Sequence, residues 1–180
     1  MTPWGQLLQP DLALGGSVLE LTPDLIAQHH LKGLILDVDE TLVPFKQSQP
    51  FEEVRQWLQQ VQTLATVVLV SNNLSHSRIS RIADTLGVPF YTGAGKPSRR
   101  KLRQAVTLMQ LPNHEIAMVG DRLFTDVLGG NRLGLFTVLV EPMVDPVDPM
   151  AANSPKQCLR NGEIWLSKRC GVVLTTTRKI

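Results

Sequence analysis

The chain has 180 residues, 43% of them hydrophobic but only 5% aromatic, and a formal net charge of +2 at pH 7. This length and composition predict a single domain with a sizeable, mainly aliphatic core. The longest apolar runs, residues 65–70 and 135–140, are far too short to cross a bilayer, so we expect a soluble protein. Residues 1–6 lack the basic and apolar regions of a secretory signal, which predicts a cytoplasmic location.

The C-terminal segment is the basic end of the chain. Its basic residues are Lys156, Arg160, Lys168, Arg169, Arg178 and Lys179. Glu163 is the single acidic residue among residues 151–180, so this segment has a net charge of +5 and the first 150 residues one of −3. The two cysteines, Cys158 and Cys170, also lie here, but without clustered histidines they suggest neither a zinc site nor a disulfide framework.

The chain alternates between strand-length apolar runs and segments of helical periodicity. Residues 1–31 form a mixed lead-in that we expect to pack on the body, with a helix that starts at Thr22 and Pro23, where threonine can cap and proline can occupy the first position. Strands are predicted from residue 34 and over 65–70, 88–91, 116–119 and 135–140. Helices are predicted over 52–63, over 75–86, from a Ser98 cap to residue 109, and over 123–133.

This βαβα alternation predicts an α/β fold, in which helices cover both faces of a mainly parallel central sheet through right-handed crossovers. Residues 141–155 hold four prolines and no periodic pattern, which is typical of a loop or linker. We therefore expect a domain over residues 1–150, which includes the lead-in, followed by a basic C-terminal tail over residues 151–180.

Two acidic residues mark the end of the first buried strand. Asp37 and Asp39 follow the apolar residues 34–36, and the two-residue period of a strand places both side chains on the same side. Two carboxylates so close together repel each other unless a cation or a shared proton relieves the repulsion. The alternative interpretation is that Asp39 caps a turn and Asp37 is a solvated strand end.

Polar residues also follow the other predicted strands. Ser71 and Asn72 follow the second strand, Lys96 lies in the loop after the third, and Asp121 and Asp126 follow the fourth. In an open parallel sheet, ligands bind where the loops leave the carboxyl ends of the strands. Four strand ends therefore converge on one predicted catalytic site.

The order and type of these residues resemble the haloacid dehalogenase (HAD) superfamily of phosphotransferases over residues 33–142. The motifs of that superfamily are Asp-x-Asp-x-Thr, a Ser or Thr after a hydrophobic strand, a Lys, and Gly-Asp-x-x-x-x-Asp, and all four are present. The resemblance implies a three-layer, Rossmann-like HAD fold and a phosphatase in which Asp37 is the nucleophile that forms an aspartyl-phosphate. Asp39 would protonate the leaving oxygen and then activate water.

The resemblance also implies a metal. A carboxylate that attacks a phosphate dianion needs a cation nearby, and hard oxygen ligands suit Mg²⁺. Asp121, Asp37 and the Asp39 carbonyl would hold the metal, with Asp126 at the same site to orient a metal-bound water or Lys96. Lys96 would be the third catalytic residue and supply positive charge for the phosphoryl oxygens. The substrate-binding residues would be Thr41, Ser71 and Asn72.

Three of these residues have simpler interpretations. In the alternative view, Ser71 caps the helix that follows it, Lys96 is a solvated loop residue, and Asp126 is an ordinary acid near a helix N-terminus.

The spacing of the motifs leaves room for only a helix and a strand between Thr41 and Ser71, and again between Ser71 and Lys96. We therefore expect a capless protein with an open site, which can accept the phosphate end of a large molecule.

Several further segments look like the YqeG-type subfamily IIIA of the superfamily, among them residues 8–11, 32–34 and 119–134. That subfamily includes the phosphatidylglycerophosphate phosphatases of mitochondria and plastids. The resemblance thus implies a lipid phosphomonoesterase that makes phosphatidylglycerol. Glu40 departs from the pattern, because many relatives have Asn there, without removing the expected activity.

Apolar and basic residues alternate between residues 159 and 170, in a pattern suited to peripheral contact with an anionic membrane. The alternative is a final helix packed on the sheet with a solvated basic face. We expect a phosphorylated lipid as the substrate, no nucleic acid and no obligate protein partner. Two other functions remain open: the same chemistry on soluble or polynucleotide phosphomonoesters, and a non-catalytic binding module.

Overall fold

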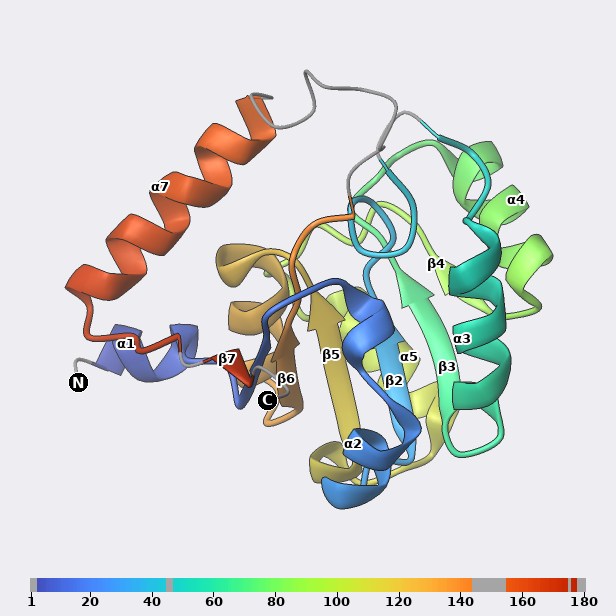
Figure 1. Cartoon of the computed structure of the whole chain (residues 1–180), viewed down its shortest axis with the longest axis horizontal. Coiled ribbons are helices and arrows are strands. Elements are labelled where there is room, and N and C mark those ends of the chain that lie inside the picture. The colour runs from blue at the N-terminus through green and yellow to red at the C-terminus, as the bar shows by residue number, and fades with distance from the viewer. Residues whose placement is uncertain (1–2, 45–46, 144–154, 175, 178–180) are drawn as a thin grey trace.

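The computed structural model describes residues 3–44, 47–143, 155–174 and 176–177 (Figure 1). Within these residues, parallel strands form one seven-stranded sheet in the order β4-β3-β2-β5-β6-β1-β7. The strands are β1 (Leu12–Leu14), β2 (Gly33–Leu36), β3 (Thr66–Val70), β4 (Phe90–Tyr91), β5 (Ile116–Gly120), β6 (Phe136–Leu139) and β7 (Thr176–Thr177). The sheet grows in one direction from β2 to β3 and in the other to β5, so β2 lies at the switch point where such sheets bind ligands.

The helices connect these strands. They are α1 (Pro3–Leu8), α2 (Pro23–Gln28), α3 (Glu52–Gln62), α4 (His76–Leu86), α5 (Arg100–Met109), α6 (Leu128–Asn131) and α7 (Pro155–Arg169). Short 3₁₀ turns lie at Val18–Glu20 and Asn113–Glu115, and a π-helical turn, η3, spans Leu123–Val127. None of the described helices is both long and apolar enough to cross a membrane.

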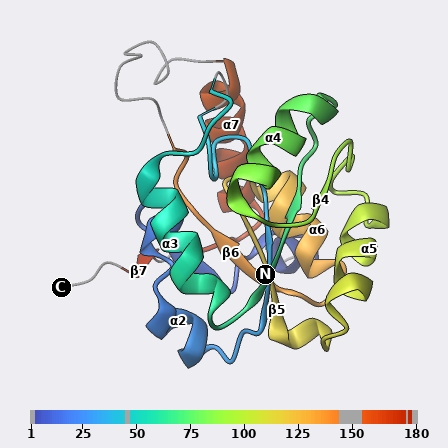
Figure 2. The ribbon, with the colours of Figure 1, turned by 90° about the vertical axis from the view of Figure 1, so that its right-hand side faces the viewer.

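The sheet lies between two helical layers, as the alternation of helices and strands predicts. Leu34 and Leu36 of β2 point into a cluster with α2, α3 and α4, whereas Ile35 points into a second cluster with α5. Figure 2 shows α2 and α3 on one side of the strands and α5 and α6 on the other. A third apolar cluster joins α1, η3 and α6 with Ile164 of α7 and Val172 after it, near β1 and β6. The predicted three-layer α/β fold with a parallel sheet is confirmed.

The lead-in differs from the prediction, because it adds a strand to the sheet as well as packing on it. β1 inserts between β6 and β7, and its neighbour Asp11 accepts hydrogen bonds at Oδ2 from the Thr137 backbone N–H (2.7 Å) and hydroxyl (3.0 Å). These bonds seat the segment on β6, a partner 126 residues away in the chain. The predicted cap of α2 is present, since Thr22 Oγ1 accepts from the Leu25 N–H.

Two predicted helices are corrected. The helix expected over residues 123–133 is the π-turn η3 followed by the four-residue α6. The Asp126 side chain accepts a hydrogen bond from the N–H of Arg122 (3.2 Å), the residue just before η3. Ser98 does not cap α5, because its N–H bonds Gly95 O within the preceding turn and the helix starts only at Arg100.

Candidate active site

The first motif leaves the carboxyl end of β2 at the centre of the sheet. The Asp37 N–H still bonds Val119 O of β5 at 2.9 Å, so the sheet ladder fixes the position of Asp37. Val38 is fully buried between the two aspartates, which turns both acidic side chains toward the same edge. Glu40 has φ of +64°, a left-handed conformation that Asn adopts more readily than other non-glycine residues. Asn, the residue that the family resemblance implies here, would therefore fit this backbone conformation.

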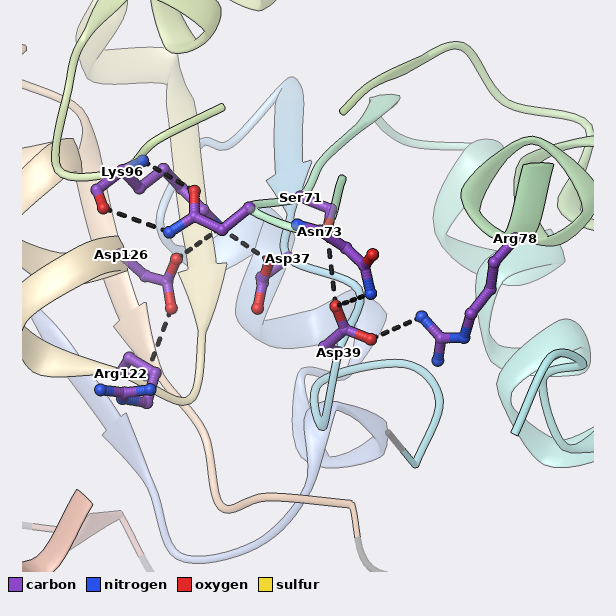
Figure 3. A network of polar contacts seen from close by, with 9 residues as sticks. Asp37, Asp39, Ser71, Asn73, Arg78, Lys96, Arg122 and Asp126 are labelled. Atoms are coloured by element: carbon purple, nitrogen blue, oxygen red, sulfur yellow. Dashed lines mark hydrogen bonds and ion pairs between the residues drawn. The ribbon is translucent and has the colours of Figure 1, made fainter. Parts of the chain in front are cut away.

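Lys96 lies at the centre of the site (Figure 3). It is 5% exposed, and its Nζ lies 2.7 Å from Asp37 Oδ1 and 2.6 Å from Asp126 Oδ1. The Asn72 side chain holds the Lys96 backbone at both its N–H (2.7 Å) and its C=O (3.1 Å). The interpretation of Lys96 as a solvated loop residue is therefore wrong, and the Asn72 side chain holds the lysine loop.

Three carboxylates gather beside Lys96. One oxygen each of Asp37, Asp121 and Asp126 lies within 4.8 Å of the others, and all three residues are buried. Asp121 Oδ2 has no hydrogen-bond partner among the described residues. Three buried carboxylates against one ammonium leave an excess of negative charge, which a hard divalent cation with oxygen ligands would neutralise. The donor set therefore fits a metal such as Mg²⁺.

Burial and mutual repulsion govern the ionisation of this cluster. Burial raises the pKa of Asp37 to about 6, with Lys96 opposing the shift and Asp126 and Asp39 adding to it. Burial, followed by the charges of Asp126 and Asp37, also raises the pKa of Asp121 well above its ordinary value. Burial alone would lower the pKa of Lys96, but Asp126 and Asp37 outweigh it and hold that pKa above its usual range. The two aspartates thus favour the charged form of Lys96.

Asp39 points away from the three carboxylates. Its Oδ1 lies 2.5 Å from Arg78 Nη1, and its Oδ2 accepts from Asn73 Nδ2 at 3.0 Å (Figure 3). Arg78 comes from α4 and also donates to the backbone oxygens of Gln47 and Pro44, so it ties Asp39 to the loop after the first motif. The Asp39 carboxylate is therefore free of the metal cluster, as an acid or base would need.

The two predicted hydroxyl residues, Ser71 and Thr41, are both buried. Ser71 is fully buried; its Oγ accepts from the Asn73 N–H at 3.0 Å and lies 3.5 Å from Asp39 Oδ2. It therefore forms a local turn and does not cap α4, which has Ser75 at its N-cap position. The Thr41 hydroxyl is also buried and has no hydrogen-bond partner in the described parts of the chain.

A pocket of about 420 Å³ opens above these groups. Its lining residues are Asp37, Asp39, Glu40, Asn72, Asn73, Leu74, Lys96, Asp121, Arg122 and Thr125. Thr41 and Ser71 are absent from this lining. In the described residues, only α3 and β3 separate Thr41 from Ser71, and only α4 and β4 separate Ser71 from Lys96, so the site has no inserted cap domain at these positions.

The C-terminal helix reaches this pocket, which the sequence did not predict. Glu163 of α7 forms an ion pair with Arg122, and Arg122 Nε lies 3.1 Å from both Glu163 oxygens. Arg160 Nε donates to the backbone oxygen of Asp121 at 3.2 Å. The sequence could have indicated Arg122, because it follows Asp121 directly. Arg78, Glu163 and Arg160 lie outside the motifs, so their spacing gives no such signal.

Comparisons with known proteins agree with this site. Residues 93–156 match the HAD-hydrolase-like family model. The chain is 32% identical to the probable phosphatase YqeG of Bacillus subtilis over 127 residues, which cover 71% of this chain and 74% of that protein. It is 28% identical to the chloroplastic phosphatidylglycerophosphate phosphatase 1 of Chlamydomonas reinhardtii over 151 residues, covering 76% of this chain but only 53% of that protein.

The fold has a counterpart among solved structures. An uncharacterized protein from Listeria monocytogenes superposes with a TM-score of 0.52 at 20% identity, covering 77% of this chain and 99% of the other. This likeness shows the fold alone. The YqeG match, which spans most of both proteins, identifies the chain as a member of the YqeG-type family of HAD phosphatases, which are phosphoric monoester hydrolases.

Proposed function

We propose that this phosphatase hydrolyses the terminal phosphomonoester of phosphatidylglycerophosphate to give phosphatidylglycerol, with Mg²⁺ as cofactor and Asp37 as nucleophile. The observation that carries the chemistry is the contact of buried Lys96 with both Asp37 and Asp126 beside Asp121. Asp37, Asp121, Asp126 and the Asp39 carbonyl would hold the metal. When bound, Mg²⁺ would neutralise charge on the phosphoryl group and so permit attack by a carboxylate.

The protein residues would act in two steps. In the first, an Asp37 oxygen forms a bond to phosphorus while the bond from phosphorus to the alcohol oxygen breaks, and Asp39 gives its proton to that oxygen. In the second, Asp39 takes a proton from a water molecule, which attacks phosphorus and releases inorganic phosphate and free Asp37. Lys96 holds Asp37 in position, since phosphoryl transfer depends mainly on positioning and electrostatic stabilisation.

Asn72 in the pocket lining, and Ser71 and Thr41 buried behind that lining, are proposed to support phosphate binding. The Asn72 side chain would act by holding the loop of Lys96. Arg122 at the pocket lining would add a cation for a substrate with a second negative charge.

Two observations favour a lipid substrate. No cap covers the described pocket between the motifs, so a large alcohol can remain outside while its phosphate enters. A relative named as a phosphatidylglycerophosphate phosphatase aligns with 76% of this chain. We further propose a cytoplasmic protein that contacts the membrane peripherally, with no nucleic acid and no obligate protein partner. The carboxylate site and the phosphatase relatives speak against the alternative of a non-catalytic binding module.

The test is release of inorganic phosphate from phosphatidylglycerophosphate in mixed micelles, with Mg²⁺ or a chelator, beside a panel of soluble phosphomonoesters. We expect Mg²⁺-dependent release from the lipid at least about tenfold above the panel, an excess worth about 1.4 kcal/mol in transition-state binding. Asp37→Asn should abolish release, while Asp84→Asn, a change at an exposed acid on α4, should not. Preference for soluble esters would overturn the lipid assignment, and full activity in Asp37→Asn would overturn the mechanism.

A further inference from the structure

Helix α7 has large apolar side chains exposed and polar side chains buried, which is unusual for a helix on a solvated surface. Among its described side chains, the buried ones are polar, namely Arg160, Glu163 and Ser167, each less than 10% exposed, and the apolar Ile164 is half-buried against the third cluster. Large apolar residues on its other sides are open to solvent: Leu159 is 55% exposed, Trp165 56% and Leu166 44%. A surface helix normally places its apolar side chains against the core and its polar ones in water. The outer face of α7 therefore has the character of a binding surface.

The charges on this face indicate what it meets. Lys168 and Arg169 are exposed, whereas Glu163, the acidic residue of the helix, is turned inward to Arg122. The Arg169 guanidinium lies 4.1 Å from the centre of the Trp165 ring, so a cation and an aromatic ring share the surface. Tryptophan and basic residues with no acid among them suit the boundary of an anionic bilayer.

The same charges disfavour a second copy of the chain. A two-fold interface through this face would bring Lys168 and Arg169 of one molecule toward the same residues of the other, and like charges across an interface cost binding energy. An anionic lipid surface has the complementary charge and can take up Leu159, Trp165 and Leu166 at the same time.

The inner face of α7 leads directly to the active site. Glu163 holds Arg122, and Arg160 donates to the backbone oxygen of Asp121. Arg160 also pairs with Glu141 at 2.9 Å, which fixes the chain after β6. In Figure 1, α7 lies to the left of β6, and it packs on η3, which contributes Thr125 to the pocket lining. A surface that binds α7 would therefore also fix the position of Asp121 and Arg122, which follow β5.

We propose that the outer face of α7, formed by Leu159, Trp165, Leu166, Lys168 and Arg169, docks on an anionic lipid bilayer and sets the pocket beside the lipid headgroups. This inference extends the proposed lipid phosphatase function, and the role that it gives to docking rests on that function. The docking itself is a binding property that can be measured without any turnover.

The experiment measures sedimentation of the full chain with vesicles of phosphatidylcholine alone or of phosphatidylcholine mixed with phosphatidylglycerol. The test variant combines Leu166→Ser with Arg169→Glu. The matched control combines Leu108→Ser with Arg103→Glu on α5, which removes another exposed leucine and reverses another exposed arginine. Basic residues near an anionic surface strengthen binding to it, so the α7 variant should lose at least about tenfold in binding to the mixed vesicles.

We expect wild type and the α5 control to bind the anionic vesicles and not phosphatidylcholine alone. Equal binding by both variants, or no binding by wild type, would overturn the proposal. A wild-type dimer in sedimentation equilibrium that the α7 variant converts to monomer would also overturn it, in favour of a second copy on this face.

Failure of the two proposals can be told apart. None of the substituted residues contacts the pocket, so release of phosphate from a soluble ester should stay within about twofold of wild type in both variants. Vesicle binding without lipid hydrolysis would leave the docking intact and refute the lipid substrate. Lipid hydrolysis in micelles without vesicle binding would refute the docking alone.

Discussion

Lys96 is the residue on which the stability of the metal-free site depends. Its ammonium group contacts two buried carboxylates, Asp37 and Asp126. Removing one partner of a buried ion pair leaves an uncompensated charge in a poorly solvated place, which costs far more than losing a surface pair. The catalytic arrangement is therefore also a structural one.

For Lys96→Met we predict a loss of about 3 kcal/mol or more in the free energy of unfolding, measured by urea titration in the presence of chelator. Lys32→Met is the control, because Lys32 pairs with Glu115 on the surface and its side chain is 60% exposed. That variant should lose less than about 1 kcal/mol. Similar losses in the two variants would show that Lys96 does not balance the buried carboxylates.

The raised pKa of Asp37 makes a second prediction at this scale. Asp37 holds its proton more tightly in the folded chain, with a pKa of about 6 against an ordinary value of 3.8. Its ionisation above pH 6 therefore opposes folding when no metal is bound. In chelator, Asp37→Asn should be more stable than wild type at neutral pH, and this advantage should shrink by about 1 kcal/mol as the pH falls from about 7.5 to about 5.5.

The measurement is urea unfolding of both proteins at each pH, with Asp84→Asn as the exposed control whose difference from wild type should stay constant. An advantage of Asp37→Asn that stays constant or grows as the pH falls would contradict the prediction.

Arg78 fixes the carboxylate of Asp39 without touching the metal cluster. Arg78→Ala should therefore lower kcat by about tenfold or more, since correctly placed acid–base catalysis is worth that much and more. The Mg²⁺-induced rise in the thermal unfolding midpoint should remain as in wild type. Arg81→Ala, at an exposed position of the same helix, should change neither quantity. Loss of the Mg²⁺ effect in Arg78→Ala would mean that Arg78 supports the metal site instead.

At the scale of elements, periodicity predicts the structure where an element is long enough to show it. The predicted helices over 52–63 and 75–86 correspond to α3 and α4, whose buried residues recur every three to four positions. β1 and β7 have only three and two residues, too few for a pattern, and they pair with partners distant in the chain. The sequence could not predict them, because their stability comes from those partners.

Helix α6 owes its close approach to the sheet to glycine. A Cβ at Gly130 would lie 2.6 Å from Thr137 Cγ2 and 2.9 Å from Met118 Cβ, both on the central strands. Gly130→Ala should therefore destabilise the protein by about 1–3 kcal/mol through overpacking. Gly162→Ala in α7 meets nothing within 4 Å and should stabilise by about 0.5–1 kcal/mol, because alanine favours a helix. Thermal and urea unfolding compare the pair, and equal effects would contradict this packing.

At the scale of the whole molecule, the topology turns sequence motifs into a site. Parallel strands bring Asp37, Lys96 and Asp121 to one edge of the sheet, so residues far apart in the chain could be assigned to one site from their order alone. The contacts of Arg78 and of Glu163 depend on how helices pack around that edge, and no spacing in the sequence encodes them. The contact of α7 with Arg122 at the pocket likewise depends on helix packing and could not be predicted from the sequence.

The central claim is that Asp37 receives the phosphoryl group. The most direct measurement quenches the Asp39→Asn variant during turnover of an aryl phosphate with Mg²⁺, reduces it with borohydride and maps the peptides by mass spectrometry. An aryl leaving group needs no proton, whereas release of the enzyme-bound phosphoryl group needs Asp39 as the base, so the intermediate should accumulate. We predict homoserine at position 37, the product of reducing an aspartyl-phosphate, and none without substrate. Turnover with an unmodified Asp37, or reduction at another carboxylate, would contradict the proposed chemistry.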